Sequence, residues 1–170
     1  MPQGGEVGRN LSVHLRAPGA KDGPAVTALI RDCPPLDANS AYCNLLQCSH
    51  FADTCVMAER DGKLIGWVSG YRPPSTPDQF FIWQVAVHED ARGAGLGGLM
   101  LDALLRRPSA RGARVLATTI TKANVASWAL FTAFARKRNL MLTKAPMFLR
   151  DDHFAGAHDT EWQVTIGPLS

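Results

Sequence analysis

The sequence predicts an α/β protein with one mixed sheet of about six or seven strands, flanked by about four helices. Strand-like and helix-like segments follow one another in a mixed order along the chain. Asp61-Gly62 joins two strand-like segments and is a strong signal for an antiparallel hairpin. The 170 residues, 46% of them apolar, suffice for one domain with a buried core. Residues 1–11 are polar and glycine-rich, so we expect a disordered tail before a single domain over residues 12–170.

The domain begins with a short strand and two helices. Residues 12–16 alternate in character and predict the strand. Residues 22–31 place their apolar side chains on one face at helical spacing and predict the first helix. The segment 37–40, Asp-Ala-Asn-Ser, offers several N-cap residues for a second helix that ends near Cys48.

The middle of the chain predicts three consecutive strands and a helix. Residues 54–60 and 64–71 form the two arms of the hairpin. Residues 80–87 are a continuous apolar run, which is typical of a strand buried on both faces. A glycine-rich loop follows this strand, and residues 96–107 predict the next helix.

The last third of the chain predicts strands on both sides of a helix. Residues 114–120 predict a strand, and residues 124–137 predict a helix with a partly aromatic apolar side. Residues 140–142 predict a short strand, 143–160 an irregular stretch, and 161–166 a final strand.

Composition argues against several classes of protein. The net charge is only +3 and the basic residues are scattered, so we expect no nucleic-acid partner. No window approaches 18 apolar residues, so we expect no membrane-spanning helix. The four cysteines match no zinc pattern and are too sparse for a small secreted scaffold. A cytoplasmic protein with free thiols is the resulting expectation.

Residues 92–98, Arg-Gly-Ala-Gly-Leu-Gly-Gly, lie between the buried strand and the next helix. A helix N-terminus binds phosphate where the backbone is open to close approach. Glycines at 93, 95 and 97 omit the side chains that would block this approach, and Arg92 can add a charge-assisted hydrogen bond. The stretch lacks the ending of a P-loop and does not follow the first strand, as a dinucleotide fingerprint would. A purely structural glycine turn remains an alternative.

The same stretch resembles motif A of the GCN5-related N-acetyltransferase (GNAT) family. R-x-x-G-x-G at residues 92–97 matches the family pattern, and N-x-x-S-x-x-L-F at 124–131 is similar to a later family motif. The resemblance implies the GNAT fold and acetyl-CoA as cosubstrate. The cofactor-binding residues that it implies are Val85, Ala86, Val87, Arg92, Gly93, Ala94, Gly95, Leu96, Gly97 and Asn124. Phe131 stands where the family often has a tyrosine that protonates the leaving thiolate, so another proton donor is required.

Longer blocks resemble the GNAT enzymes that acetylate L-2,4-diaminobutyrate in ectoine biosynthesis. These blocks are residues 37–46, 70–74, 83–87 and 124–131, within a resemblance that spans about residues 12–168. It implies acetyl transfer to the 4-amino group, giving N4-acetyl-L-2,4-diaminobutyrate. It also implies a homodimer.

A pocket for diaminobutyrate must accept two ammonium groups and one carboxylate. Asp37 is a candidate acid, with a helix N-cap as an equal alternative. Tyr42 could orient an amine or donate a proton, although ordinary packing is the alternative. Trp83 could form a wall whose aromatic face favours an ammonium group, or it could pack in the core.

The polar stretch 151–161 is rich in titratable groups. The resemblance implies that His158 and Glu161 belong to the substrate site, on a loop that folds over the substrate. A solvated loop is the alternative. A metal site is disfavoured, because closed metal sites rarely rely on such an irregular Asp/His run.

The attacking amine must lose a proton, which costs about 4–5 kcal/mol if its pKa is close to that of lysine. Glu161, His158 and Asp37 are candidate bases, and the sequence does not rank them. Tyr42 or the newly formed ammonium group could protonate the thiolate. No cysteine lies in an obvious nucleophile motif, which favours direct amine attack over an acyl-enzyme.

Three other functions remain open at this stage. The same fold could acetylate another small amine or a protein amine. The phenylalanine at 131 gives some support to a non-catalytic acyl-CoA sensor. A nucleotide-binding module is the weakest of the three.

Overall fold

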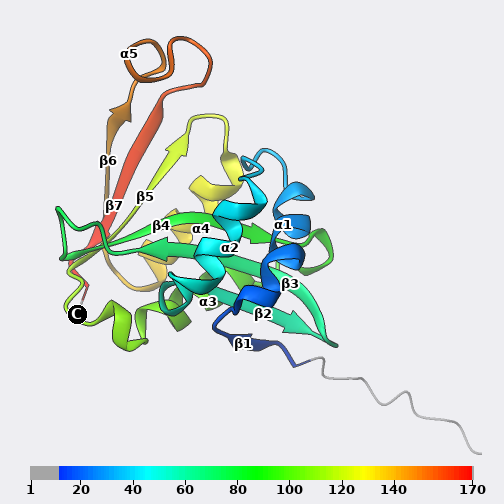
Figure 1. Cartoon of the computed structure of the whole chain (residues 1–170). Coiled ribbons are helices and arrows are strands. Elements are labelled where there is room, and N and C mark those ends of the chain that lie inside the picture. The colour runs from blue at the N-terminus through cyan, green and yellow to red at the C-terminus, as the bar shows by residue number, and fades with distance from the viewer. Residues whose placement is uncertain (1–11, 170) are drawn as a thin grey trace, which may run out of the picture.

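The computed structural model describes residues 12–169 and contains a seven-stranded mixed sheet with helices on both faces (Figure 1). The predicted tail, residues 1–11, lies outside the described residues. The strand order across the sheet is β1-β2-β3-β4-β5-β7-β6. The strands are β1 (His14–Arg16), β2 (Val56–Arg60), β3 (Lys63–Tyr71), β4 (Gln79–Val87), β5 (Val115–Thr121), β6 (Met141–Phe148) and β7 (Glu161–Gly167). The helices are α1 (Gly23–Arg31), α2 (Ala41–Ser49), α3 (Leu96–Leu105), α4 (Val125–Lys137) and α5 (Arg150–Phe154).

The predicted α/β class and the predicted order of elements are confirmed, with one correction in the C-terminal third. The stretch 143–160 is not irregular throughout, because β6 continues to Phe148 and α5 follows it. Pairing with β7 over the whole length of β6 supplies the hydrogen bonds that local sequence does not indicate. Pro146 weakens the strand signal, but β6 is an edge strand, where proline is tolerated.

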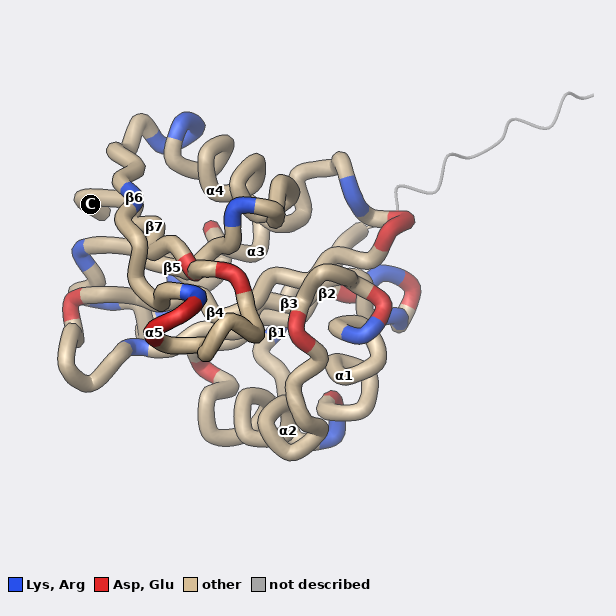
Figure 2. The backbone as a smooth tube through the Cα atoms, turned by 90° about the horizontal axis from the view of Figure 1, so that it is seen from above, with Lys and Arg blue, Asp and Glu red and all other residues tan. Residues whose placement is uncertain are grey.

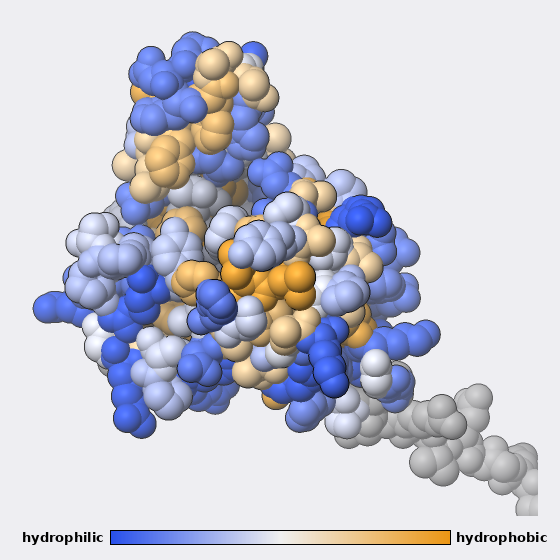
Figure 3. Space-filling model, viewed as in Figure 1, coloured by the Kyte–Doolittle hydropathy of each residue, from blue (hydrophilic) through white to orange (hydrophobic). Residues whose placement is uncertain are grey.

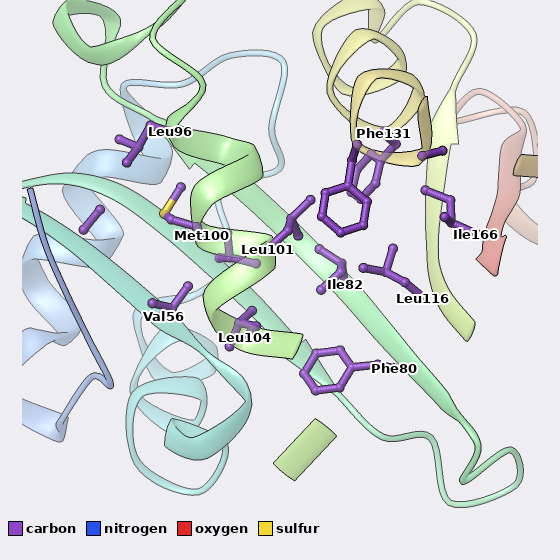
Figure 4. Packing of buried hydrophobic residues seen from close by; sticks show 14 of the residues in the cluster. Val56, Phe80, Ile82, Leu96, Met100, Leu101, Leu104, Leu116, Phe131 and Ile166 are labelled. Atoms are coloured by element: carbon purple, nitrogen blue, oxygen red, sulfur yellow. The ribbon is translucent and has the colours of Figure 1, made fainter. Parts of the chain in front are cut away.

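Each face of the sheet has its own core. On one face, α3 and α4 cover the strands, and Figure 4 shows Leu101 of α3 on the side of Ile82 of β4, with Met100 on the opposite side of the helix. On the other face, α1 and α2 cover a smaller cluster around Trp67. Burying one such side chain stabilises the fold by about 1.5–3 kcal/mol, so these two cores hold β4 between helix layers.

The two central strands separate halfway along their length. β4 and β5 are parallel partners only over Gln79–Ile82 and Val115–Thr118. Beyond that point β4 stays paired with β3, and β5 stays paired with β7. The strands therefore open as a V, and the facing edges of β4 and β5 lose their backbone partners.

A β-bulge lies on β4 where the V begins. The pairing with β3 passes from Ile82 to Gln84, so Trp83 is an extra residue on β4. Ile82 before the bulge and Val85 after it pack into the same core, although residues three positions apart in a regular strand point to opposite faces. Ala86 joins the other core. The bulge thus shifts the alternation of β4 by one residue.

The β6–β7 hairpin, with α5 at its tip, projects from the body of the molecule (Figure 1). Side chains of β6 are exposed along almost its whole length. Exposed apolar residues include Met147, Phe148 and Leu149, and apolar atoms are visible on the surface of this projection in Figure 3. Figure 2 shows lysine and arginine segments scattered over the chain, with acidic and basic segments together at α5. We call residues 141–167 the arm.

No helix within residues 12–169 is both long enough and apolar enough to cross a bilayer.

Candidate active site

A cavity of about 530 Å³ lies where β4 and β5 separate. Its walls come from five parts of the chain that are distant in sequence: the loop before α2, β4, β5, the start of α4 and the arm. Of the predicted site residues, it brings together Asp37, Trp83, Val85, Asn124, His158 and Glu161.

The glycine loop has the geometry that anion binding requires. Gly93 and Gly95 have φ values of +78° and +76°, and a Cβ atom added at either would meet only open space. Gly95 is the N-cap of α3, and the first helical hydrogen bond runs from Leu99 N to Gly95 O at 3.1 Å. The amides before Leu99 therefore have no helical acceptors and face an unobstructed approach.

Arg92 connects this loop to β4. Its Nε donates to the carbonyl of Val87 at 3.0 Å, which places the guanidinium between the end of β4 and the start of α3. The side chains of Ala86 and Leu96 are buried in the cores, so these two predicted residues can contact a cosubstrate only through their backbone.

Gly97 has a different role from the one that the sequence predicts for its missing side chain. A Cβ atom at Gly97 would lie 2.9 Å from Cδ1 of Leu130 on α4. The absence of a side chain here allows α3 and α4 to approach each other, whereas Gly93 and Gly95 leave the anion approach open.

Glu161 lies at the first position of β7, opposite Thr121 of β5 and beside the cavity. Its Oε2 is buried and has no hydrogen-bond partner among the described residues. Burial raises the pKa of this carboxyl, and the negative charge of Asp37 raises it further, while His158 and Thr119 lower it. A carboxylate with an unused buried oxygen and a raised pKa is suited to accept a proton from an amine.

His158 is oriented towards this carboxylate. Its Nδ1 lies 2.7 Å from the carbonyl of Asp159. Because a carbonyl only accepts, Nδ1 carries the hydrogen, and Nε2 faces Glu161 Oε1 at 3.8 Å. The ring also packs against Phe154 of α5, with centroids 4.6 Å apart. His158 and Glu161 together can hold and exchange one proton at the cavity wall.

Asp37 is not the N-cap of α2. Ser40 has that role, since its hydroxyl accepts from Cys43 N at 3.1 Å. The Asp37 carboxylate is instead at the cavity, close enough to influence the pKa of Glu161.

The two predicted aromatic residues occupy different places. Trp83, the bulged residue, is 45% exposed and lines the cavity. Its ring is edge-on to that of Tyr71, with the ring centroids 6.2 Å apart. Tyr42 lies on α2, is 69% exposed, and is not among the residues that line the cavity. Its role as an amine ligand or proton donor stays a prediction.

Asn124 and Phe131 belong to α4 and its cap. Asn124 Oδ1 accepts from Ser127 N at 3.1 Å and so caps α4 at the cavity. Phe131 lies deeper in the wall and is almost fully buried. Because its side chain is a phenyl ring, it offers no hydroxyl at that position.

Sequence reasoning missed several residues of the cavity wall, notably Gln84, Thr119, Arg150 and Asp159. Arg150 is the only lysine or arginine that lines the cavity within the described chain, and its Nη1 lies 3.5 Å from Asp159 Oδ1. The expectation of an irregular loop concealed it, since α5 and its contacts place it there.

Across residues 12–169, no group of three or more His, Cys, Asp and Glu side chains is arranged to hold a metal ion.

Comparison with known proteins identifies the class first. The sequence profile of the Acetyltransferase (GNAT) family matches residues 24–135, and the chain belongs to this family. A crystal structure of Ard1 from Thermoplasma volcanium shares the fold, with a TM-score of 0.73 over 94% of this chain and all of that chain at 15% identity. The predicted fold and acetyltransferase class are confirmed.

Nearer relatives define the branch of the family. The chain is 51% identical over 157 residues to the L-2,4-diaminobutyric acid acetyltransferase of Methylotuvimicrobium alcaliphilum. The matched residues cover 92% of this chain and 91% of that protein. It is 42% identical to the enzyme of the same name from Halomonas elongata, over 96% of this chain and 85% of that one. The structure of diaminobutyrate acetyltransferase from Paenibacillus lautus, in complex with L-2,4-diaminobutyric acid and coenzyme A, superimposes with a TM-score of 0.89. It is 36% identical, over 94% of this chain and 96% of that chain.

Proposed function

We propose that this protein transfers the acetyl group of acetyl-CoA to the 4-amino group of L-2,4-diaminobutyrate. The observation that carries the proposal is the charge pattern of the cavity. Three carboxylates, Asp37, Asp159 and Glu161, and one guanidinium, Arg150, line it. Diaminobutyrate has two ammonium groups and one carboxylate, so its charges complement this wall. The relatives named above support the same substrate.

The glycine loop and the free edge of β4 are suited to acetyl-CoA. The amides of residues 93–97 and the Arg92 side chain would hold the pyrophosphate. The edge of β4 at Val85–Val87, which has lost β5 as a partner, offers backbone groups to the pantetheine arm. Asn124, at the cap of α4, lies on the other side of the V. The thioester would then lie at the cavity, next to the amine.

The proton path uses Glu161 and His158. The Glu161 carboxylate takes a proton from the 4-ammonium group, directly or through water, and His158 shares it. The free amine attacks the thioester carbonyl, whose oxygen is polarised by a backbone N–H near Val85. The C–S bond breaks, and the thiolate takes a proton from the ammonium group just formed or from Tyr42. No acyl-enzyme is required.

The experiment is a thiol-release assay with acetyl-CoA. L-2,4-diaminobutyrate is compared with ornithine, lysine, 1,3-diaminopropane and a short peptide, and NMR locates the acetyl group. We expect a strong preference for diaminobutyrate with acetylation at N4. Preference for another amine would overturn the substrate, and bound acetyl-CoA without release for any amine would indicate a sensor.

We also propose that the protein is a cytoplasmic homodimer with one N-acetyltransferase domain over residues 12–170. The exposed apolar residues of β6, Met147 and Phe148, support a second copy at the arm. The free thiols support a reducing compartment. Light scattering should give a dimeric mass, and Phe148→Asp should reduce it to that of a monomer. A monomeric wild-type protein at micromolar concentration would contradict the dimer.

A further inference from the structure

A chain of amide side chains runs from the cavity wall into the packing between α1 and α2. Gln84 Oε1 on β4 accepts from Asn39 Nδ2 at 2.8 Å. The same Asn39 nitrogen lies 3.3 Å from Asn44 Oδ1 on α2. Asn44 Nδ2 in turn donates to the hydroxyl of Thr27 on α1 at 2.9 Å. Four side chains from four separate segments thus form one continuous network.

The network holds the backbone of Asp37 through hydrogen bonds to its carbonyl. Gln84 Nε2 donates to the Asp37 carbonyl at 2.8 Å, and Asn39 N donates to the same oxygen at 3.0 Å. Within the described residues, the Asp37 carboxylate has no hydrogen bond of its own to another side chain. Its position at the cavity therefore depends on its backbone, and its backbone is held by Gln84 and Asn39.

The depth of the network makes it a rigid support. Asn44 is 1% exposed and Gln84 is 7% exposed, so neither amide can exchange its partners for bulk water. Gln84 uses both its donor and its acceptor, and Asn44 does the same. A satisfied buried network of this kind fixes one arrangement, because every alternative leaves a buried polar group without a partner.

We propose that Gln84, Asn39 and Asn44 are positioning residues that fix the distance between Asp37 and Glu161 and so select the length of the diamine. The inference rests on the proposed function and adds to it that Asp37 receives the 2-ammonium group while Glu161 receives the 4-ammonium group. The loop that carries Asp37 and the arm that carries Glu161 both line the cavity, and they are distant in sequence. The distance between the Asp37 and Glu161 carboxylates therefore depends on how each segment is held in place. Gln84 holds the Asp37 loop against β4.

The test is Gln84→Met, which keeps the length of the side chain and removes both hydrogen bonds. Gln47→Met is the matched control, since Gln47 is an equally buried glutamine on α2 that lies outside the network. We expect Gln84→Met to lower the ratio of kcat/KM for diaminobutyrate to kcat/KM for ornithine at least about fivefold, mainly through KM for diaminobutyrate. KM for acetyl-CoA should stay within about threefold. Gln47→Met should leave the ratio unchanged.

Hydrogen–deuterium exchange of residues 35–40 supplies a readout that does not depend on the substrate. Exchange should accelerate in Gln84→Met and not in Gln47→Met, because Asn39 N is bonded to the carbonyl that Gln84 holds. If wild-type protein does not acetylate diaminobutyrate, the proposed function fails, while the exchange data still judge the anchoring. Unchanged exchange together with an unchanged selectivity ratio would overturn the inference.

Asn39→Ala keeps the inference testable if Gln84→Met does not fold, since Asn39 lies nearer the surface. It removes the middle of the network and leaves the bond from Gln84 to Asp37 in place. We expect a smaller loss of selectivity in the same direction. In the double variant the two effects should be less than additive, because both act through one loop, and full additivity would contradict a shared role.

Discussion

The two halves of the proposed active site are built in different ways. The glycine loop is one contiguous segment, residues 92–98, whose functional groups are backbone amides presented by positive-φ glycines and a helix N-terminus. The acidic cavity is assembled from side chains of the loop before α2, β4 and the arm. A backbone site tolerates any side chain that stays out of the way, whereas a side-chain site depends on how distant segments are held together. The first can serve a cosubstrate common to a family, and the second can be altered to suit a particular amine.

The largest effect should come from closing the backbone site. In Gly95→Val, a β-branched side chain at φ +76° is strained and occupies the approach to the α3 amides. We expect kcat/KM for acetyl-CoA to fall more than about 100-fold. Gly112→Val carries the same backbone strain at φ +76° in a turn away from the site and is the control. Equal losses in the two variants would mean that strain alone is responsible.

Glu161→Gln should have the next largest effect, on the side-chain half. It keeps the shape of the residue and removes the proton acceptor, so kcat should fall about 10²–10³-fold with little change in KM for acetyl-CoA. Asp151→Asn removes an exposed acid from the same arm and should not change kcat. Wild-type turnover in Glu161→Gln would exclude this carboxylate as the base.

Arg150→Ala should have a moderate effect that depends on the substrate. The Arg150 side chain is 57% exposed, so the contact with the substrate carboxylate that we propose would be screened by water. We expect KM for diaminobutyrate to rise about 5–20-fold. For 1,3-diaminopropane, which has no carboxylate, wild type and variant should have the same KM. A similar rise for both substrates would assign Arg150 to holding the arm through Asp159.

The smallest effect should be on stability. Because folding raises the pKa of Glu161 above its ordinary value of 4.5, the folded state holds this proton more tightly than the unfolded state does. Protonation of Glu161 therefore contributes to the free energy of unfolding. This contribution is complete below the pKa that Glu161 has in the unfolded state, and it is lost as pH rises through the pKa that it has in the folded state. Glu161→Gln should therefore melt about 1–4 °C higher than wild type near pH 7.5, with the difference shrinking towards pH 4.5. A lower Tm at neutral pH would show that the fold stabilises the carboxylate.

The contrast between the two halves also explains how much could be predicted from sequence. The open backbone of Gly95 at the start of α3 was predictable, because a contiguous loop carries its own geometry. Gly97 shows the limit, since its contact with Leu130 depends on how two helices pack. Glu161 and His158 were proposed by resemblance, and the structure brings them together at the cavity. Arg150 and Gln84 could not be found, because their positions follow from the extended β6 and from a bulge with no local sequence signal.

The bulge at Trp83 implies a constraint on chain length in β4. Insertions and deletions are usually tolerated in loops, but here one extra residue lies in the middle of a central strand. If β4 kept all its residues in a regular strand, Val85 would turn away from the α3 and α4 core and Ala86 would turn away from Trp67. Deleting Trp83 would instead leave Ile82 and Val85 two positions apart, so both cores would be kept and the exposed ring at the cavity would be lost. A single surplus residue, accommodated as a bulge, is what allows one strand to pack in both cores and still present a side chain to the cavity.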